Sequence, residues 1–158
     1  MNENDLAKEL RIYLEKVVSD YRLPVKNGEP RSPNVLNGYL PPKRSGQGDD
    51  YPFVLVRPDA GQSEEEQTEV TVSIIIGCYT EEFDGHEYCL NIMQRIRTAL
   101  TSLPNGILAD KYVLDFPFRW ENYPEQPYPQ WLLEIETKWV FNTPQPIVNY
   151  IDLTNEVI

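Results

Sequence analysis

This sequence has few of the residues from which metal and redox sites are built. Its 158 residues include one histidine, His86, and two cysteines, Cys78 and Cys89, with no C-x-x-C spacing. A structural zinc site takes four Cys or His ligands, so the sequence excludes a site of that kind. Both cysteines stand within apolar patterns and are interpreted as small buried hydrophobic residues. We expect no metal and no cofactor.

Basic residues are also scarce. Lys and Arg number 14 against 25 Asp and Glu, which gives a net charge of −11. Because affinity for nucleic acid comes mainly from neutralising phosphates, this balance argues against sequence-specific nucleic-acid binding. No apolar run approaches the roughly 18 residues of a membrane span, and the acidic start lacks the pattern of a signal peptide. We expect a soluble protein made in a reducing cytoplasm, with no membrane partner.

Motifs of catalysis are equally hard to find. The sequence has no phosphate-binding glycine loop, nucleophile elbow or dinucleotide fingerprint. One pattern invites a catalytic interpretation: Glu136 and Lys138 form a Glu-x-Lys, and Asp59 follows Pro58 upstream, as in metal-dependent nucleases. Strand alternation, however, places Glu134, Glu136 and Lys138 opposite the apolar residues, which is typical of a half-exposed antiparallel strand. We expect a protein that is not an enzyme.

What the sequence does contain is apolar periodicity. Apolar residues at steps of three and four predict helices over 5–21 and 85–103. Alternating β-forming residues predict strands. Pro58 is expected to end the first strand, and an acidic turn is expected to follow it. These strands span 51–57, 69–79, 107–120 and 131–141. The order α-β-β-α-β-β predicts one α+β domain over 1–158, with a mostly antiparallel sheet of four to five strands and both helices packed on one face.

Long Pro-rich segments separate these elements. The segment 25–50 carries the apolar stretch "NVLNGYLPPK", whose side chains pack either on this domain or on a neighbouring subunit. The loop "ENYPEQPYPQW" is stiff and aromatic, and residues 142–158 form either one more strand or an arm. Stiff segments lose little entropy on docking, and Tyr is common at interfaces. The candidates for a subunit interface are Leu36, Tyr39, Leu40, Tyr123, Tyr128 and Tyr150.

The order of elements resembles that of the tail terminator (tail completion) proteins of long-tailed bacteriophages and prophages. The likeness covers 5–141 and rests on an N-terminal helix followed by "YPFVLVRP", "TEVTVSIIIGCYT", "CLNIMQRIRTALTSL" and "WLLEIETKWVF". It implies an α+β subunit of a ring, a homohexamer, at the head-proximal end of the virion tail. Such a ring stops growth of the tail tube and joins it to the head connector. The implied partners are the tail tube protein and a head-completion or connector protein, and no catalytic residues are implied.

A ring through which DNA passes benefits from a lumen that repels phosphate, which the net negative charge would provide. The candidates for such a lumen lie in two acidic loops: Glu64, Glu65, Glu66, Glu81, Glu82 and Asp84. Two alternatives remain open from the sequence. One is a generic soluble binding or adaptor module, and the other, the least favoured, is a metal-dependent nuclease-like domain that uses Asp59, Glu136 and Lys138.

Overall fold

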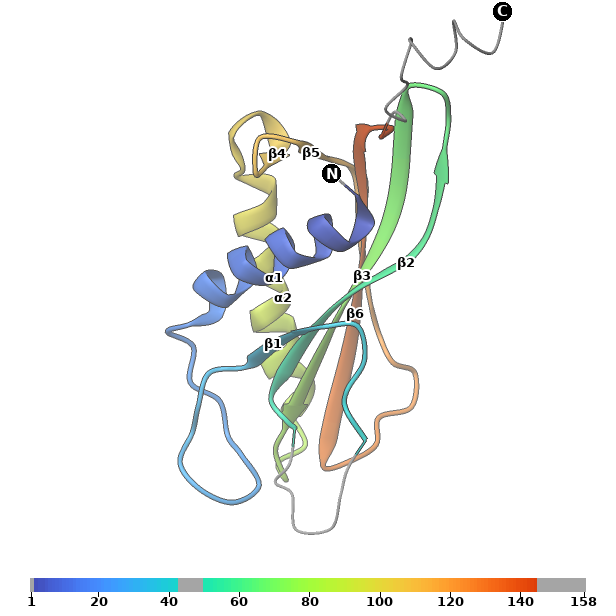
Figure 1. Cartoon of the computed structure of the whole chain (residues 1–158). Coiled ribbons are helices and arrows are strands. Elements are labelled where there is room, and N and C mark those ends of the chain that lie inside the picture. Colours follow the sequence, from blue (N-terminus) through green and yellow to red (C-terminus); the bar gives the residue numbers. More distant parts are fainter. Residues whose placement is uncertain (1, 43–49, 145–158) are drawn as a thin grey trace, which may run out of the picture.

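The computed structural model describes residues 2–42 and 50–144, which form two α-helices and one six-stranded sheet (Figure 1). The helices are α1 (Glu3–Val18) and α2 (Gly85–Thr101). The strands are β1 (Asn34–Asn37), β2 (Phe53–Ser63), β3 (Gln67–Tyr79), β4 (Ile107–Leu108), β5 (Tyr112–Asn122) and β6 (Gln130–Asn142). A 3-10 turn at Pro104–Gly106 precedes β4, and the strands lie in the order β1-β2-β3-β6-β5-β4 across the sheet.

The sheet departs from the predicted one in the number, order and direction of its strands. The chain order is α-β-β-β-α-β-β-β, and β1 runs parallel to β2 while the other neighbours are antiparallel. The predicted order α-β-β-α-β-β, with a mostly antiparallel sheet of four to five strands, is therefore wrong. The missed strands, β1 and β4, are four and two residues long. Such short strands show too little alternation to be recognised in a sequence.

The sequence predicted that Pro58 ends β2, and this prediction is wrong. The strand continues to Ser63, and only residues 64–66 connect it to β3. The carbonyl oxygen of Val56 accepts a hydrogen bond from the N–H of Gly38, on the side of β2 that faces β1. Residues two apart in a strand direct their backbone groups to the same side, so the nitrogen of Pro58 also lies on this side, beyond the end of β1. A missing N–H is tolerated there because no ladder partner needs it. A register shift between Pro58 and Ala60 marks a bulge at Asp59.

Both helices lie on one face of the sheet (Figure 1): α1 packs on β1 and β2, and α2 on β3, β5 and β6. The main core lies between them and the sheet, where alternate residues of β3 and β6 are buried. Its largest member, Trp139, is fully buried and donates its indole N–H to Thr137. The hydroxyl of Tyr13 donates to the carbonyl of Ala99, which ties α1 to α2. No helix of the described residues is long and apolar enough to cross a membrane.

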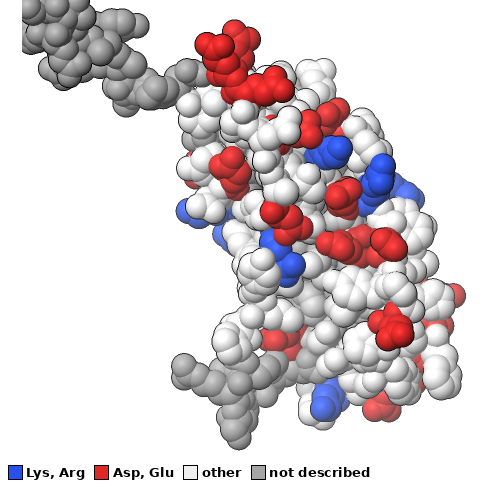
Figure 2. Space-filling view, turned by 90° about the vertical axis from the view of Figure 1, so that its right-hand side faces the viewer, with Lys and Arg blue, Asp and Glu red and all other residues white. Residues whose placement is uncertain are grey.

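The opposite face of the sheet is seen in Figure 2, and its buried apolar residues gather near one end of the strands. There a second, smaller cluster forms around the buried Phe53, Leu55 and Ile75. Gly77 lies directly opposite Phe53, and a Cβ on Gly77 would lie 2.2 Å from an atom of the phenyl ring. The ring therefore occupies the space that the glycine leaves, a recognised way of stabilising glycine in a sheet.

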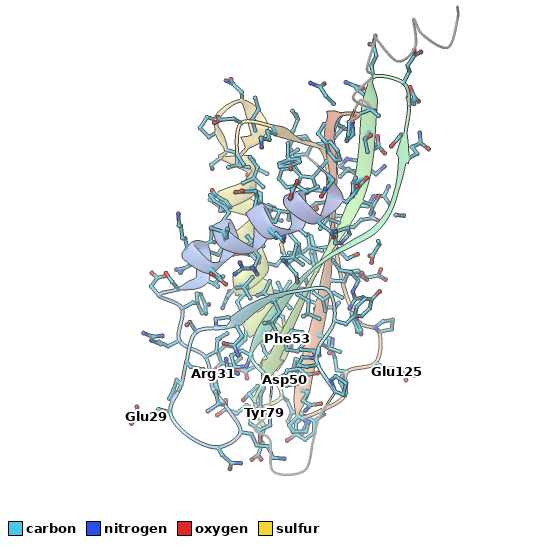
Figure 3. All side chains as sticks on the ribbon, viewed as in Figure 1. Glu29, Arg31, Asp50, Phe53, Tyr79 and Glu125 are labelled. Atoms are coloured by element: carbon cyan, nitrogen blue, oxygen red, sulfur yellow. The ribbon has the colours of Figure 1, made fainter. Side chains whose placement is uncertain are left out.

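Arg31 fixes the approach to β2 (Figure 3). Its guanidinium donates to the carbonyl oxygens of Asp50 at 3.2 Å, Tyr51 at 3.0 Å and Pro52 at 3.2 Å. The planar, five-donor guanidinium suits several fixed acceptors at once. The chain that follows residues 43–49 is thereby held next to the start of β1.

Candidate functional site

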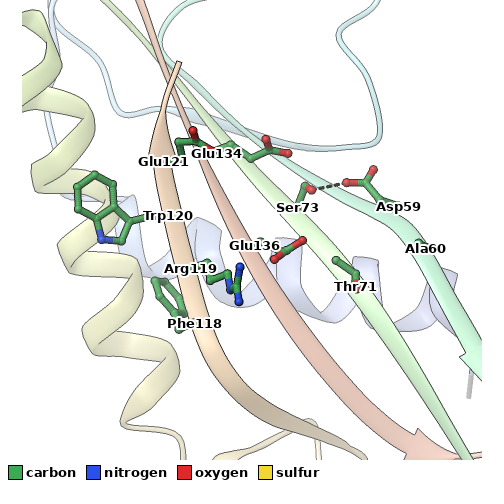
Figure 4. A pocket seen from close by; sticks show the side chains of 10 residues that line it. All are labelled: Asp59, Ala60, Thr71, Ser73, Phe118, Arg119, Trp120, Glu121, Glu134 and Glu136. Carbon is green, nitrogen blue, oxygen red and sulfur yellow. Dashed lines mark hydrogen bonds between the residues drawn. The ribbon is translucent and has the colours of Figure 1, made fainter. Parts of the chain in front are cut away.

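The uncovered part of the sheet carries a groove with a volume of about 900 Å³. Strands β2, β3, β5 and β6 all contribute to it (Figure 4). Its lining includes four carboxylates, Asp59, Glu121, Glu134 and Glu136, and a single basic side chain, Arg119. The groove is therefore polar and acidic, unlike the mostly apolar pockets that bind small molecules.

Several of these residues form a row across the sheet. Ser73 on β3 lies directly opposite Glu136 on β6, and Glu136 lies directly opposite Arg119 on β5. The bulge in β2 brings Asp59 to this row, where its carboxylate accepts a hydrogen bond from the hydroxyl of Ser73 (Figure 4). Two residues of the nuclease alternative, Asp59 and Glu136, thus share one face and one row.

Lys138, the third residue of that alternative, belongs to the next row. It lies directly opposite Thr71 on one side and Asp115 on the other. Within residues 2–42 and 50–144, no group of three or more His, Cys, Asp or Glu side chains is arranged to hold a metal ion. The two carboxylates and the lysine of the nuclease alternative therefore lie in adjacent rows of one face, with Lys138 one row away from Asp59 and Glu136.

Acidic side chains predominate over this face (Figure 2). Glu121 lies directly opposite Glu134, a pair of like charges on adjacent strands. Beside them, burial and the negative charge of Glu134 raise the pKa of the Tyr123 phenol. The face has the electrostatic character of a surface that repels anions.

The residues proposed for a subunit interface have different surroundings. Leu36 and Leu40 are partly buried against the smaller apolar cluster of their own sheet. Tyr39 is 72% exposed and carries the guanidinium of Arg57 over its ring, 3.9 Å from the centroid. Tyr123 is half-buried at the end of the groove, Tyr128 is exposed, and Tyr150 lies outside the described residues, as does most of the 142–158 segment.

The two acidic loops that the sequence analysis grouped are not together in the structure. Glu64–Glu66 form the turn between β2 and β3, whereas Glu81, Glu82 and Asp84 lie between β3 and α2. These positions are the two ends of β3, whose 13 residues span about 40 Å at roughly 3.3 Å per residue. The acidic loops therefore mark opposite ends of the molecule.

Two open sheet edges are the feature that sequence reasoning largely missed. On one side β4 pairs only with Tyr112 and Val113 of β5, so Leu114–Asn122 has no outer strand among the described residues. On the other side β1 pairs only with the first four residues of β2, so Arg57–Ser63 has no outer strand within the part of the chain that the structure describes. The signal was present, because Pro58 and Pro117 each stand inside a strand, and proline favours edges and bulges.

The two edges differ in their side chains. The β5 edge presents Phe116, which is 64% exposed, and Trp120, which is 43% exposed. The β2 edge presents the small residues Ala60 and Gly61. Bulges interrupt both edges, between Pro58 and Ala60 in β2 and between Asp115 and Arg119 in β5.

At the end of the sheet near the β3–α2 connection, two aromatic rings stand in solvent. Phe83 is 83% exposed and stacks on Tyr128, with 5.4 Å between the ring centroids and 21° between the planes. The sequence analysis had named Tyr128 but not Phe83, which stands within an acidic stretch without apolar periodicity.

Comparison of the sequence with protein-family models and with curated proteins finds no match. A function for this chain therefore has to be inferred from its own residues and surfaces.

Proposed function

We propose that this chain is a non-enzymatic structural protein whose copies join edge to edge into a closed ring. In line with its resemblance to tail terminator proteins, the ring would cap a phage tail tube and join it to the head connector. The observation that supports the proposal best is the pair of open, unlike edges on opposite sides of one sheet.

Unlike edges favour a ring over a symmetric dimer. In a two-fold dimer each copy uses the same surface, which must be complementary to itself. Here the β5 edge strand carries the large exposed side chains Phe116 and Trp120, and the β2 edge strand carries the small Ala60 and Gly61. Contact between two different surfaces of identical copies is head-to-tail, and it generates a ring when the rotation closes.

Side chains, rather than a continuous strand ladder, would form most of this contact. Each edge contains a proline next to a bulge, Pro58 in β2 and Pro117 in β5. Such features limit indiscriminate pairing of exposed strands. Aromatic side chains at the centre of an interface contribute much of its binding energy. Phe116 and Trp120 are therefore the anchors that we assign to the contact.

The charge distribution is also consistent with a ring around DNA. When sheets join edge to edge, one face of each sheet points inward, and the helices on the other face lie outside. The inward face would then be the one that carries Asp59, Glu121, Glu134 and Glu136. Such a wall repels the phosphates of a passing duplex and keeps them from binding. The acidic loops at the ends of β3 would lie at the two rims of the ring.

The proposal is tested by the mass of the chain in solution, measured by light scattering over a wide range of concentrations. We expect a discrete species of six copies for the unmodified chain and a monomer for the double variant Phe116→Lys, Trp120→Lys. The control is Ile12→Lys, because Ile12 is 41% exposed but lies on α1, outside both edge strands. It should form the ring normally.

Other outcomes would favour the alternatives. A monomer at every concentration would contradict the ring and favour an adaptor module. Mg²⁺-dependent cleavage of nucleic acid that is lost in Lys138→Ala would contradict the non-enzymatic assignment. The ring proposal expects Lys138→Ala to assemble like the unmodified chain, since Lys138 lies between Thr71 and Asp115 on the sheet face, away from both edges.

A further inference from the structure

The exposed pair Phe83 and Tyr128, with the two segments that hold it, 80–84 and 123–131, is called here the aromatic end. Exposed apolar side chains that lie together, rimmed by polar residues, often mark a site where another molecule binds. The two rings bury part of their faces against each other, and Tyr128 also meets Trp131 edge to face, with centroids 6.1 Å apart. The aromatic end lies at one end of β3 and is separate from the exposed aromatic residues of the β5 edge.

Hydrogen bonds fix the positions of the two rings. The Tyr128 hydroxyl donates to the carbonyl of Glu81 at 2.6 Å, and the backbone N–H of Thr80 donates to Pro129 at 3.0 Å. Trp131 adds a third link through its indole N–H, which donates to the carbonyl of Thr80 at 3.0 Å. The two segments are thereby tied together although they are far apart in the sequence.

A side chain inside the second segment braces it further. The amide nitrogen of Gln126 donates to Tyr123 at 3.1 Å and to Leu132 at 2.9 Å, and its oxygen accepts from the N–H of Leu132 at 2.7 Å. A loop held in this way loses little conformational entropy when a partner binds. Exposed rings on a pre-ordered loop have the properties of binding anchors.

In the sequence, the charged side chains next to the two rings are all acidic. Residues 80–88 and 123–131 contain no Lys or Arg. Their charged side chains are Glu81, Glu82, Asp84, Glu87 and Glu125. Burial and the charges of Asp84 and Glu82 also raise the pKa of the nearby Tyr88 phenol. A complementary surface is apolar at its centre and carries Lys and Arg around it.

We propose that the aromatic end binds a different protein, through a segment of that protein that is apolar at its centre and flanked by Lys and Arg. A second copy of this chain does not fit, because two aromatic ends would bring four carboxylates against four of the same sign. The inference goes beyond the ring and does not rest on it, since the aromatic end is separate from both open edges.

The test is calorimetric titration of the full chain with three synthetic peptides of equal length. The first combines Leu and Lys at helical spacing; the second has Ser in place of Leu, and the third has Glu in place of Lys. We expect only the first to bind measurably, and its Kd to rise about tenfold in Phe83→Ser, the loss expected for one anchor residue. Added salt should weaken the binding.

Phe83→Ser should leave the fold intact, because the Phe83 ring is 83% exposed. Ile12→Ser is the matched control: it removes an exposed apolar side chain on α1, outside the aromatic end and both edge strands, and should leave the Kd unchanged. The proposal is overturned if Phe83→Ser binds as the unmodified chain does, or if the Ser and Leu peptides bind equally well. It is also overturned if Phe83→Ser changes the number of copies in the assembly, because the aromatic end would then be a contact between copies.

Discussion

The two faces of the sheet are built from the same strands, yet they bury very different residues. On β6, every second residue from Trp131 to Phe141 is buried beneath the helices, whereas the residues between them are only half-buried on the other face. On that other face only the end of the sheet near Phe53 is fully apolar, and the segment around Leu36 and Leu40 covers it there. The residue types on each face therefore follow from what covers it. The helices exclude water along one whole face, whereas the short segment on the other face excludes water only locally.

The comparison also explains the distribution of charge. Where the cover ends, the strands carry Asp, Glu, Lys and Arg in cross-strand rows, which cost little while they remain in water. The acidic face, the open edges and the aromatic end are all parts of the sheet that helices leave uncovered. The same strands thus stabilise the fold on one face and present binding surfaces on the other.

Replacing a buried and an exposed tryptophan by alanine gives the largest expected difference in the free energy of unfolding. Trp139 is fully buried, so Trp139→Ala should lower the free energy of unfolding by about 3–5 kcal/mol. Trp120 is 43% exposed, and Trp120→Ala should change that free energy by about 1 kcal/mol or less while weakening assembly. Urea unfolding under conditions that keep the chain monomeric measures both values. Equal losses would show that the β5 edge belongs to the core.

The small cluster around Phe53 is tested by Gly77→Ala. A methyl group at residue 77 would lie 2.2 Å from an atom of the Phe53 ring, which must then move away from the sheet. We expect a loss of about 1–3 kcal/mol in the free energy of unfolding, as for other overpacked sites. Gly38→Ala cannot serve as the control, because Gly38 has a positive φ of 81° that strains any other residue. The control is Ser73→Ala, on the same face of β3, which adds no atoms and removes the hydrogen bond to Asp59. An unchanged stability in Gly77→Ala would mean that Phe53 does not pack there.

On the acidic face, reversing one charge should stabilise the chain. Glu121 lies opposite Glu134, so Glu121→Lys replaces a repulsive pair by an attractive one. The expected gain is about 0.2–1 kcal/mol in the free energy of unfolding, decreasing with added salt. Glu64→Lys, in the β2–β3 turn, changes the net charge equally and serves as the control. A similar gain in both variants would assign the effect to net charge rather than to the pair.

The smallest expected effect concerns Tyr123, whose phenol pKa is raised by burial and by Glu134. Because its pKa is higher in the folded chain than in the unfolded one, its contribution to stability is complete below a pH of about 10. That contribution is lost as the pH rises through the folded-state value. Glu134→Gln should lower the pKa of Tyr123 in an ultraviolet titration. A pKa that stays the same in this variant would leave burial as the whole cause.

Sequence periodicity was sufficient for the long elements. The helix predicted over 5–21 is present as Glu3–Val18, and the strand predicted over 131–141 is present as Gln130–Asn142 with the expected alternation. Each of these elements has one continuous cover along its length, so its buried residues recur at a constant period. The prediction was right where packing is uniform.

Periodicity failed where packing is local. β1 lies within a Gly- and Pro-rich segment and has only two apolar residues, Val35 and Leu36, which point to opposite faces. The row of Asp59, Ser73 and Glu136 depends on the register between strands and on a bulge, and neither is visible in a single strand. The aromatic end depends on hydrogen bonds between two distant segments. Each of these features is set by pairing that only the folded chain reveals.

The central claim, that the unlike edges of neighbouring copies meet, is tested most directly by cross-linking. Ala60→Cys and Arg119→Cys each place one accessible thiol on an edge strand without removing an aromatic anchor, while the native Cys78 and Cys89 are buried. With a short cysteine-reactive cross-linker, we predict cross-linked pairs when the two variants are mixed, and far fewer when either is treated alone. Equal cross-linking within a single variant, or none in the mixture, would contradict the head-to-tail ring.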